Sequence, residues 1–372
     1  FNQSLGSWNT GNVTNMSLMF YNSDSFNQSL ANWNTSNVTT MQQMFSESQS
    51  FNGSLANWNV GNVNNFFAMF HNTPSFNQNL NTWTFGAATN INMQQMFDGA
   101  TAFNGAVGTW NTANVTNMSF MFRNATAFNQ AIGSWNVGNV TNFTQTFFNA
   151  TSFNQNLSGW NPTSATTMQE MFRNATSFNG AINGWDVRDV NNFFLMFHQA
   201  TSFNQSLDQW QLGIANNVNM QQMFDGATAF NGSLAGWDVS KVINFSFMFR
   251  NADAFNQNLN TWTINTSAPV NMHQMFLDAD SFNGNVSTWN TSTVTDMGHM
   301  FRNTDLNQNL GGWNVTYVTN MNEMFSWTLM SAANYNATLI GWAAQTVQSN
   351  VRLGAHGLSY TSAAQTARNT LT

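Results

Sequence analysis

The sequence predicts a repeat solenoid of the α/β class, in which each coil of about 25 residues contributes one short strand and one short helix or 3-10 turn. The first observation is a period. The pair Phe-Asn occurs at residues 1, 26, 51, 76, 103, 128, 153, 178, 203, 230, 255 and 282, and Leu306-Asn307 and Tyr335-Asn336 continue the series to 14 starts. The second is composition, because only 6% of the residues are charged while 15% are aromatic. A chain this aromatic is expected to build a core rather than to be disordered.

The unit that begins at residue 26 shows both elements of a coil. In residues 26–30, Phe, Gln and Leu alternate with Asn and Ser, which is the periodicity of a strand. Val38, Met41, Met44 and Phe45 follow at spacings of three, three and one, which place them on one face of a short helix or 3-10 turn.

Equivalent positions in successive coils, here called columns, account for the composition. One column, which includes Trp33 and is expected to close the wedge of core, holds 14 of the 15 Trp, and two further columns hold 21 of the 22 Met. Such regularity predicts core packing for the methionines rather than binding of a soft metal. The units that start at residues 76, 203 and 255 are 27 residues long. Their two extra residues fall between the Trp and first Met columns, where we expect an inserted loop.

A longer repeat lies over the short one. Residues 94–105 are identical to residues 221–232, an offset of 127 that equals five units. One unit buries too little to fold alone, so neighbouring coils must supply the remaining burial and backbone hydrogen bonds. Length that grows by duplicated blocks favours a spacer or display surface over an active site, which needs one unique constellation.

Several functions are excluded or disfavoured. Eight Lys and Arg against 15 Asp and Glu give a net charge of −7, which disfavours nucleic acid as a partner. The chain has no cysteine for a disulfide or thiolate site and no apolar run long enough for membrane insertion. The five histidines lack metal-ligand spacing, and no nucleophile or phosphate-loop motif is present. Asp278 and Asp280 are expected in a solvated turn rather than a calcium site. We therefore expect no enzyme activity, no cofactor and no metal.

The pattern FNQxLxxWNxxNVTNMxxMF, with the "MF.NA..F" junction, resembles the repeat of the BspA-like leucine-rich-repeat surface proteins, and it does so along nearly the whole chain. The resemblance implies a leucine-rich-repeat-like solenoid in a secreted, cell-surface setting. It also implies roles in adhesion, coaggregation or binding of host or matrix components. It supplies neither a ligand nor a catalytic residue.

The tail resembles the segment that closes such arrays. We therefore predict a solenoid of about 13 repeats over residues 1–334 and a degenerate last repeat with a C-terminal cap over residues 335–372. The chain begins at Phe1 without an initiator Met or a polar capping repeat. From this we expect a processed or partial chain, part of a larger protein or of a homo-oligomeric assembly.

Two sets of polar columns are candidates for an interaction surface. The Asn after the first Phe, or its substitute, is present in all 14 units. It forms either a structural asparagine ladder, which we favour, or a polar stripe that meets a ligand. A nearby strand position that varies among Ser, Ala and Asn includes Asn79 and Asn156. The column after "MF" contains Arg123, Arg173, Arg250, Arg302, His71 and His198, with Asp98 and Asp225 one coil before Arg123 and Arg250. These residues are expected to form ion pairs between coils or to bind an acidic partner.

The function predicted from these observations is that of a non-enzymatic extracellular protein. It is the adhesive or structural module of a bacterial adhesin or appendage that contacts other subunits, cell surfaces or matrix. The alternative is a glycan-binding module that uses aromatic residues outside the core columns, above all Phe67 and Phe194. A third option is ice binding through the Thr column that includes Thr14 and Thr39.

Overall fold

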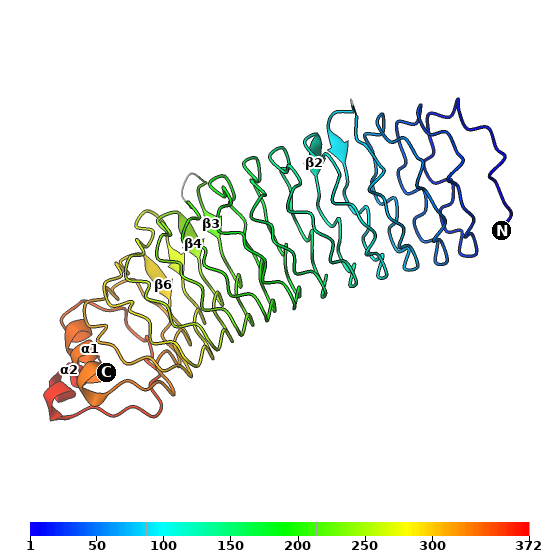
Figure 1. The fold of residues 1–372 in the computed structure, drawn as a ribbon. Helices are drawn as coiled ribbons and strands as arrows, with labels where there is room; N and C mark the ends of the chain where they lie inside the picture. Colours follow the sequence, from blue (N-terminus) through cyan, green and yellow to red (C-terminus); the bar gives the residue numbers. More distant parts are fainter. Residues whose placement is uncertain (87, 213–214, 372) are drawn as a thin grey trace. The chain divides into compact units, whose positions relative to one another are not determined.

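The computed structural model describes residues 1–86, 88–212 and 215–371. It consists of two compact units, Phe1–Asp186 and Val187–Thr372. In each unit successive coils of the chain lie side by side, as Figure 1 shows. The predicted class, a repeat solenoid, is confirmed.

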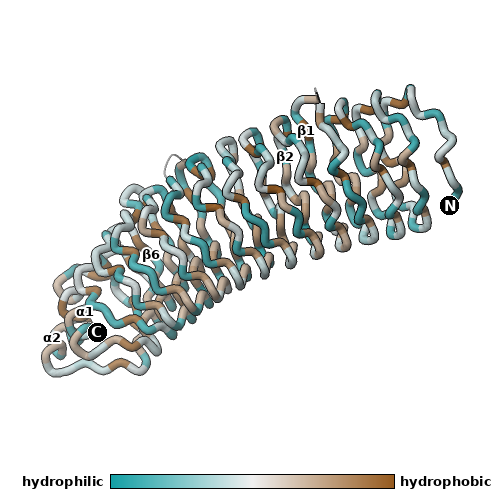
Figure 2. The backbone as a smooth tube through the Cα atoms, in the orientation of Figure 1, coloured by the Kyte–Doolittle hydropathy of each residue, from teal (hydrophilic) through white to brown (hydrophobic). Residues whose placement is uncertain are grey.

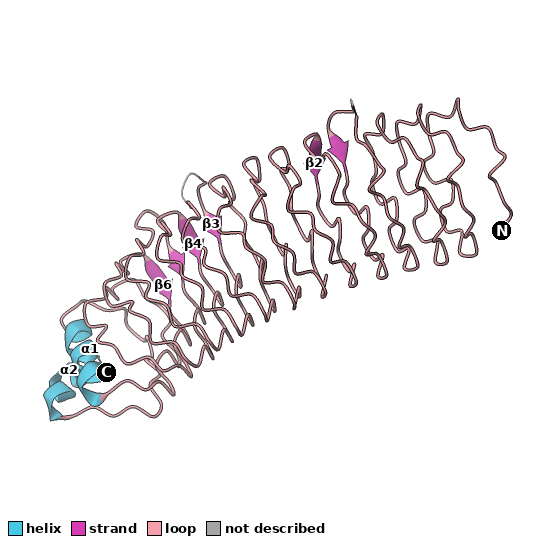
Figure 3. Cartoon of the chain, viewed as in Figure 1, coloured by secondary structure: helices cyan, strands magenta, loops and turns pink. Residues whose placement is uncertain are grey.

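One parallel ladder joins the coils within each unit. In the first unit β1 (Ile91–Asn92) pairs with β2 (Val115–Asn117), and single bridges continue the ladder on both sides. In the second unit β3 (Val218–Asn219), β4 (Val242–Asn244), β5 (Val270–Asn271) and β6 (Val294–Asp296) form a four-stranded parallel sheet. The rungs lie at the Asn, Thr or Asp before the first Met column or its substitute. Figure 3 shows how little of each coil is strand.

The strand expected at residues 26–30 is not formed there, although its side chains alternate as predicted. Phe26 and Leu30 are buried, while Asn27 is exposed. The backbone N–H of Asn27 donates to the side-chain Oδ1 of Asn2, at 2.8 Å, and not to a backbone carbonyl. Because side chains replace carbonyls in this contact, the segment is extended without being part of the strand ladder.

The helix or 3-10 turn expected over residues 38–45 is a run of β-turns. Within the coil the N–H of Met44 donates to the Met41 carbonyl, whereas the N–H groups of Met41 and Gln43 donate to the next coil. Some backbone N–H groups of this segment thus bond within the coil, and others bond to carbonyls of the next coil. The third residue of the Met-to-Met turn, Gln43, has φ of 52°, as a type II turn requires, and Glu47 four residues later has φ of 64°.

The core consists of columns of stacked rings. Phe26 lies 5.9 Å from Phe51 and Trp33 lies 6.4 Å from Trp58 between ring centroids, with nearly parallel planes. The indole Nε1 of Trp33 also donates to the Leu5 carbonyl of the previous coil, so a buried polar group is paired. Figure 2 shows hydrophobic and hydrophilic residues alternating along the coils. The predicted core role of the Phe, Trp and Met columns is confirmed for the described coils that follow the first, whereas Phe1, Trp8 and Met19 of the first coil are exposed.

The 27-residue coils carry β1, β3 and β5, and each pairs with a strand in the following coil. The extra residues allow one more ladder bond, such as that from the Ile91 N–H to the Asn114 carbonyl. Residues 87, 213 and 214, in two of the three predicted insertions, lie outside the described residues.

Helices occur at the C-terminal end of the second unit, where α1 (Ala332–Ala343), η1 (Ser362–Ala364) and α2 (Gln365–Leu371) pack together. The Ser331 hydroxyl caps α1 by accepting from the Asn334 N–H. The predicted boundary between solenoid and cap after residue 334 stays a prediction. Residue 372, the last residue of the predicted cap, lies outside the described residues.

Candidate binding edge

The turn segment of each coil presents an edge on which the repeat varies most. We call it the variable edge and define it by the columns of Gln42, Gln43, Ser46 and Glu47. Four of the five histidines and four of the eight Lys and Arg occupy these columns. Because the rest of the coil is almost free of cations, charge and chemical variety are concentrated here.

In the first unit the edge carries a buried carboxylate between two cations. The Asp98 side chain is only 2% exposed. Arg123 from the next coil donates to both of its oxygens, Nε to Oδ1 at 2.9 Å and Nη2 to Oδ2 at 2.5 Å. Nδ1 of His71, from the previous coil, lies 3.1 Å from Oδ2. Burial alone raises the pKa of Asp98, but the contacts with His71 and Arg123 outweigh burial and lower it below the ordinary value of 3.8.

The same cluster recurs in the second unit, 127 residues later. Arg250 donates to Asp225 through Nε at 2.9 Å and Nη2 at 2.6 Å, and His198 Nδ1 lies 3.2 Å away. Two of the ion pairs expected from the sequence are therefore formed, and in both units the carboxylate is nearly inaccessible. Arg123 and Arg250 are thus engaged within the chain.

Three arginines of the edge lie against aromatic rings. The guanidinium of Arg123 lies 4.9 Å from the Phe120 ring centroid, and Arg250 lies 4.9 Å from that of Phe247. Arg173 lies 5.3 Å from the Phe148 ring. Cation–π contacts at these distances hold the flat groups in fixed positions.

Arg173 and Arg302 differ from Arg123 and Arg250 in their hydrogen bonds. Arg173 donates to Glu170 of its own turn at 2.8 Å and leaves Nε without a hydrogen bond. Arg302 forms no side-chain hydrogen bond in the described part of the chain, and its Nε is buried. Arg302, like the Nε of Arg173, therefore has hydrogen-bond donors that no described group accepts from.

The other predicted residues divide between two segments. Phe67 and Phe194 are half-buried and lie on the variable edge, at equivalent positions of the two units. Asn79 and Asn156 are exposed but belong to the segment that begins each coil, where Asn79 accepts the Ala106 N–H at 2.9 Å and Asn156 the Ser158 N–H at 2.8 Å. The structure does not bring these asparagines to the edge.

The asparagine column is a ladder, as favoured, but its chemistry differs from stacked amides. The Oδ1 of Asn104 accepts both the backbone N–H of Asn129, at 2.9 Å, and the Nε2 of Gln130, at 2.9 Å. The oxygen is therefore structural, because it takes the place of a backbone carbonyl between coils.

Sequence reasoning missed two acidic residues and one histidine of the edge. Glu47 lies 3.5 Å from His71, Glu170 pairs with Arg173, and His273 lies 3.1 Å from Asp296 of the next coil. Only the column after "MF" was considered. The adjacent columns, read at the same period, would have placed these residues beside the cations.

Stacked coils, a parallel ladder within each unit and columns of stacked rings define a leucine-rich-repeat-like repeat solenoid. A family model described as "Mycoplasma protein of unknown function, DUF285" matches residues 1–106, 91–210, 195–270 and 263–360. The chain belongs to this family. A search of curated proteins found no match.

Two solved structures are similar in arrangement only. An internalin from Listeria monocytogenes (inlF) shares 12% identity and a TM-score of 0.23, covering 78% of this chain and 82% of its own. The TLR13–ssRNA13 complex shares 10% identity and a TM-score of 0.22, covering 92% of this chain and 52% of its own. Among the described residues, no helix has the length and apolarity needed to span a bilayer, and no cluster of side chains suits a metal ion.

Proposed function

We propose that this chain is the adhesive or structural module of a bacterial extracellular surface protein or appendage. It binds protein components of other cells or of the matrix through the variable edge. The observation that carries the proposal is the concentration of cationic, histidine and aromatic side chains on one edge of an otherwise uniform, weakly charged coil. The resemblance of the repeat to BspA-like surface proteins supports the extracellular setting.

The edge has the chemistry of a protein-binding surface. Aromatic and Arg side chains supply most of the energy in many interfaces. Here Phe148 and Arg173 are held against one another before any partner binds, so little side-chain entropy is lost on binding. Arg302 adds a cation with free donors. A polar, amide-rich protein surface fits this set.

The test is adhesion of beads coated with the full chain to a panel of matrix proteins and to bacterial and host cells. We expect a variant with Phe148→Ser, Arg173→Gln and Arg302→Gln to lose most of the binding. Asn57→Ser, an exposed change outside the edge, is the matched control. Adhesion that survives the triple change, or no adhesion to any protein surface, would exclude this role for the edge.

Glycan binding is the second candidate, favoured by the half-buried rings of Phe67 and Phe194 at equivalent places on the edge. Sugars stack on aromatic faces, and each unit offers one ring at this position of the edge. Retention of the chain on a glycan array should disappear when both rings are replaced by Ser. Unchanged retention excludes these rings as the glycan site.

The structural role makes a separate prediction. Electron microscopy of native material should show ordered filaments or bundles if the module builds an appendage. Separate rods would exclude the appendage role and leave adhesion as the only remaining function.

A further inference from the structure

Of the 15 Trp, Trp327 alone stands outside the Trp column, and it lies on the variable edge in the column of Glu47. In the other described coils this column holds Asn, Asp, Gly, Glu or Gln, most often Asn, as at Asn22 and Asn303. Its residues have φ between 49° and 74°, a left-handed conformation that Asn and Gly adopt more readily than bulky residues do. The backbone therefore disfavours Trp at this position, where φ is 66°.

The Trp327 ring is not part of the core. Its side chain is 58% exposed, whereas Trp313 of the same coil is fully buried. The indole Nε1 of Trp313 donates to the Val286 carbonyl at 3.0 Å. For Trp327 the described residues provide no acceptor for the indole N–H. An aromatic surface and a hydrogen-bond donor are thus both open to a ligand.

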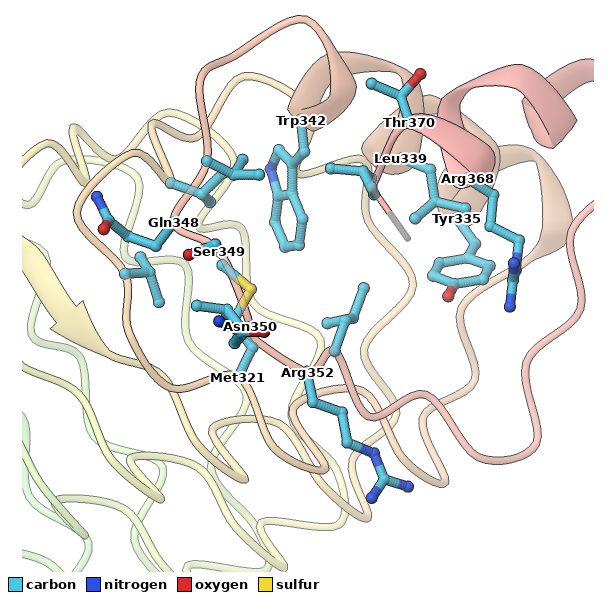
Figure 4. Close-up of a pocket in the computed structure, with 16 residues that line it drawn as sticks. Met321, Tyr335, Leu339, Trp342, Gln348, Ser349, Asn350, Arg352, Arg368 and Thr370 are labelled. Carbon is cyan, nitrogen blue, oxygen red and sulfur yellow. The ribbon is translucent and has the colours of Figure 1, made fainter.

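A segment of the cap fixes the ring in place. Residues 347–353 run along the last coil and line a cavity there, as Figure 4 shows in part. The chain continues to His356, whose carbonyl accepts the Trp327 N–H at 2.8 Å and whose imidazole lies 6.3 Å from the indole, at 17° between planes. A Cβ at Gly357 would lie 3.5 Å from the indole, so the cap backbone also lies beside the ring. Because the ring is already held, binding costs little side-chain entropy.

Polar groups border the ring on the side of His356. The Nε2 of His356 lies 3.5 Å from Oε1 of Glu323, so the imidazole connects the indole with a carboxylate. His356 is exposed and Glu323 is half-buried, so both are accessible to solvent. The carboxylate accepts hydrogen bonds, the indole N–H donates, and the imidazole can do either. Hydroxyl groups, which both donate and accept, match this set.

The exposed apolar surface has the size of a small ring. A Trp side chain can bury roughly 250 Å², so the exposed part of Trp327 offers about 150 Å². Leu329, which is also exposed, leaves the total far below the roughly 800 Å² that each partner buries in a standard protein interface. A pyranose ring with equatorial hydroxyl groups has a flat face of C–H groups and a rim of hydroxyls. That ligand matches both the indole and its polar border.

We propose that Trp327 is a stacking platform for a glycan, namely for a pyranose ring of the glucose configuration. The C–H face of the sugar lies on the indole, and hydroxyls at its rim bind Glu323 and His356. The site is separate from the rings of Phe67 and Phe194 and does not depend on the function proposed for the edge.

The test is calorimetric titration of the full chain with cellotetraose, a chain of β-linked glucose. Trp327→Asn introduces the commonest residue of this column, and we expect it to weaken binding about tenfold or more. Glu323→Gln should weaken binding less, about threefold, because an amide oxygen still accepts. Tyr317→Ser is the matched control, because Tyr317 is an exposed aromatic residue outside the columns of the edge. It should leave binding unchanged.

The melting temperature separates a binding role from a structural one. Because Asn adopts a positive φ more easily than Trp, Trp327→Asn should leave the melting temperature unchanged or higher while binding is lost. A lower melting temperature with retained binding would show that the ring only secures the cap. If stability and binding fall together, Glu323→Gln, which keeps the ring, decides the proposal.

Three further outcomes would overturn the proposal. The first is absence of cellotetraose binding, and the second is equal loss in the Tyr317→Ser control. The third is loss of cellotetraose binding in the chain with Phe67→Ser and Phe194→Ser, which would move the glycan site to those rings. If Trp327→Asn impairs adhesion to protein surfaces and the chain binds no sugar, the ring belongs to a protein interface instead.

Discussion

Replacing Gly284 by Ala tests how closely the coils approach one another. A Cβ at this position would overlap the Gln257 carbonyl oxygen of the previous coil and lie 2.6 Å from its carbonyl carbon. It would also lie 3.2 Å from the ring of Phe282. The φ of Gly284 is not in the left-handed region, so the reason for glycine is space and not conformation.

The cost follows from the nature of the obstructing atom. Overpacking typically costs about 1–3 kcal/mol, and it is lowest where a flexible side chain can move away. Here a backbone carbonyl within the stack must move, so we expect about 3 kcal/mol of lost stability. Gly312 is the control because a Cβ there meets nothing within 4 Å. Its replacement by Ala should be neutral or stabilising by about 0.4–1 kcal/mol through the unfolded chain.

Native-state hydrogen exchange is the suitable assay, because it reports the opening free energy of individual coils in a long repeat array whose global unfolding need not be two-state. The Leu259 N–H, which donates to the Asn285 carbonyl, reports the coil pair directly. Equal protection of this amide in the Gly284→Ala and Gly312→Ala variants would refute the close approach.

Three further predictions concern paired polar groups. Trp58→Phe removes the donor to a buried carbonyl and should cost about 1–3 kcal/mol in urea unfolding, whereas Trp8→Phe, at an indole that is 53% exposed, should change stability by less than about 0.5 kcal/mol. Asp98 has a folded-state pKa below its ordinary value of 3.8, so its stabilisation is present above that pH and lost as pH falls through the folded pKa; Asp98→Asn should flatten stability against pH below about 4. Arg250→Gln should cost about 1.5–3 kcal/mol because the buried carboxylate of Asp225 loses its two hydrogen bonds from Arg250, and Arg302→Gln, with no such bond, should lower the melting temperature much less.

The period made most of the core predictable. Equivalent residues of stacked coils must be neighbours, so the Trp and Phe columns, and the pairing of Asp98 with Arg123, follow from spacing alone. The strand could not be placed in the same way. Asn27 alternates with buried neighbours as a strand residue does, but its N–H meets a side-chain oxygen, and alternation does not reveal which acceptor a donor finds.

Other features depend on the distance between backbones. Gln28, Gly53, Gln78 and Gly105 occupy one column in successive coils, and the sequence alone gives no reason for the alternation. In the structure a Cβ at Gly53 or Gly105 would overlap the carbonyl of the preceding Gln.

The two His–Asp–Arg clusters lie on the variable edge, but their polar groups already bind one another. Asp98 and Asp225 are satisfied by their own arginines and nearly inaccessible, so these clusters position the edge and cannot themselves receive a partner. Partner-facing chemistry remains with groups that have unused donors or open rings, such as Arg302 and Phe67. Asp98→Asn should therefore lower stability above about pH 4, where the carboxylate is ionised, and leave adhesion per folded molecule unchanged. Arg302→Gln should lower adhesion and leave stability nearly unchanged. If both variants lose stability and adhesion together, the edge contributes to binding only as part of the fold.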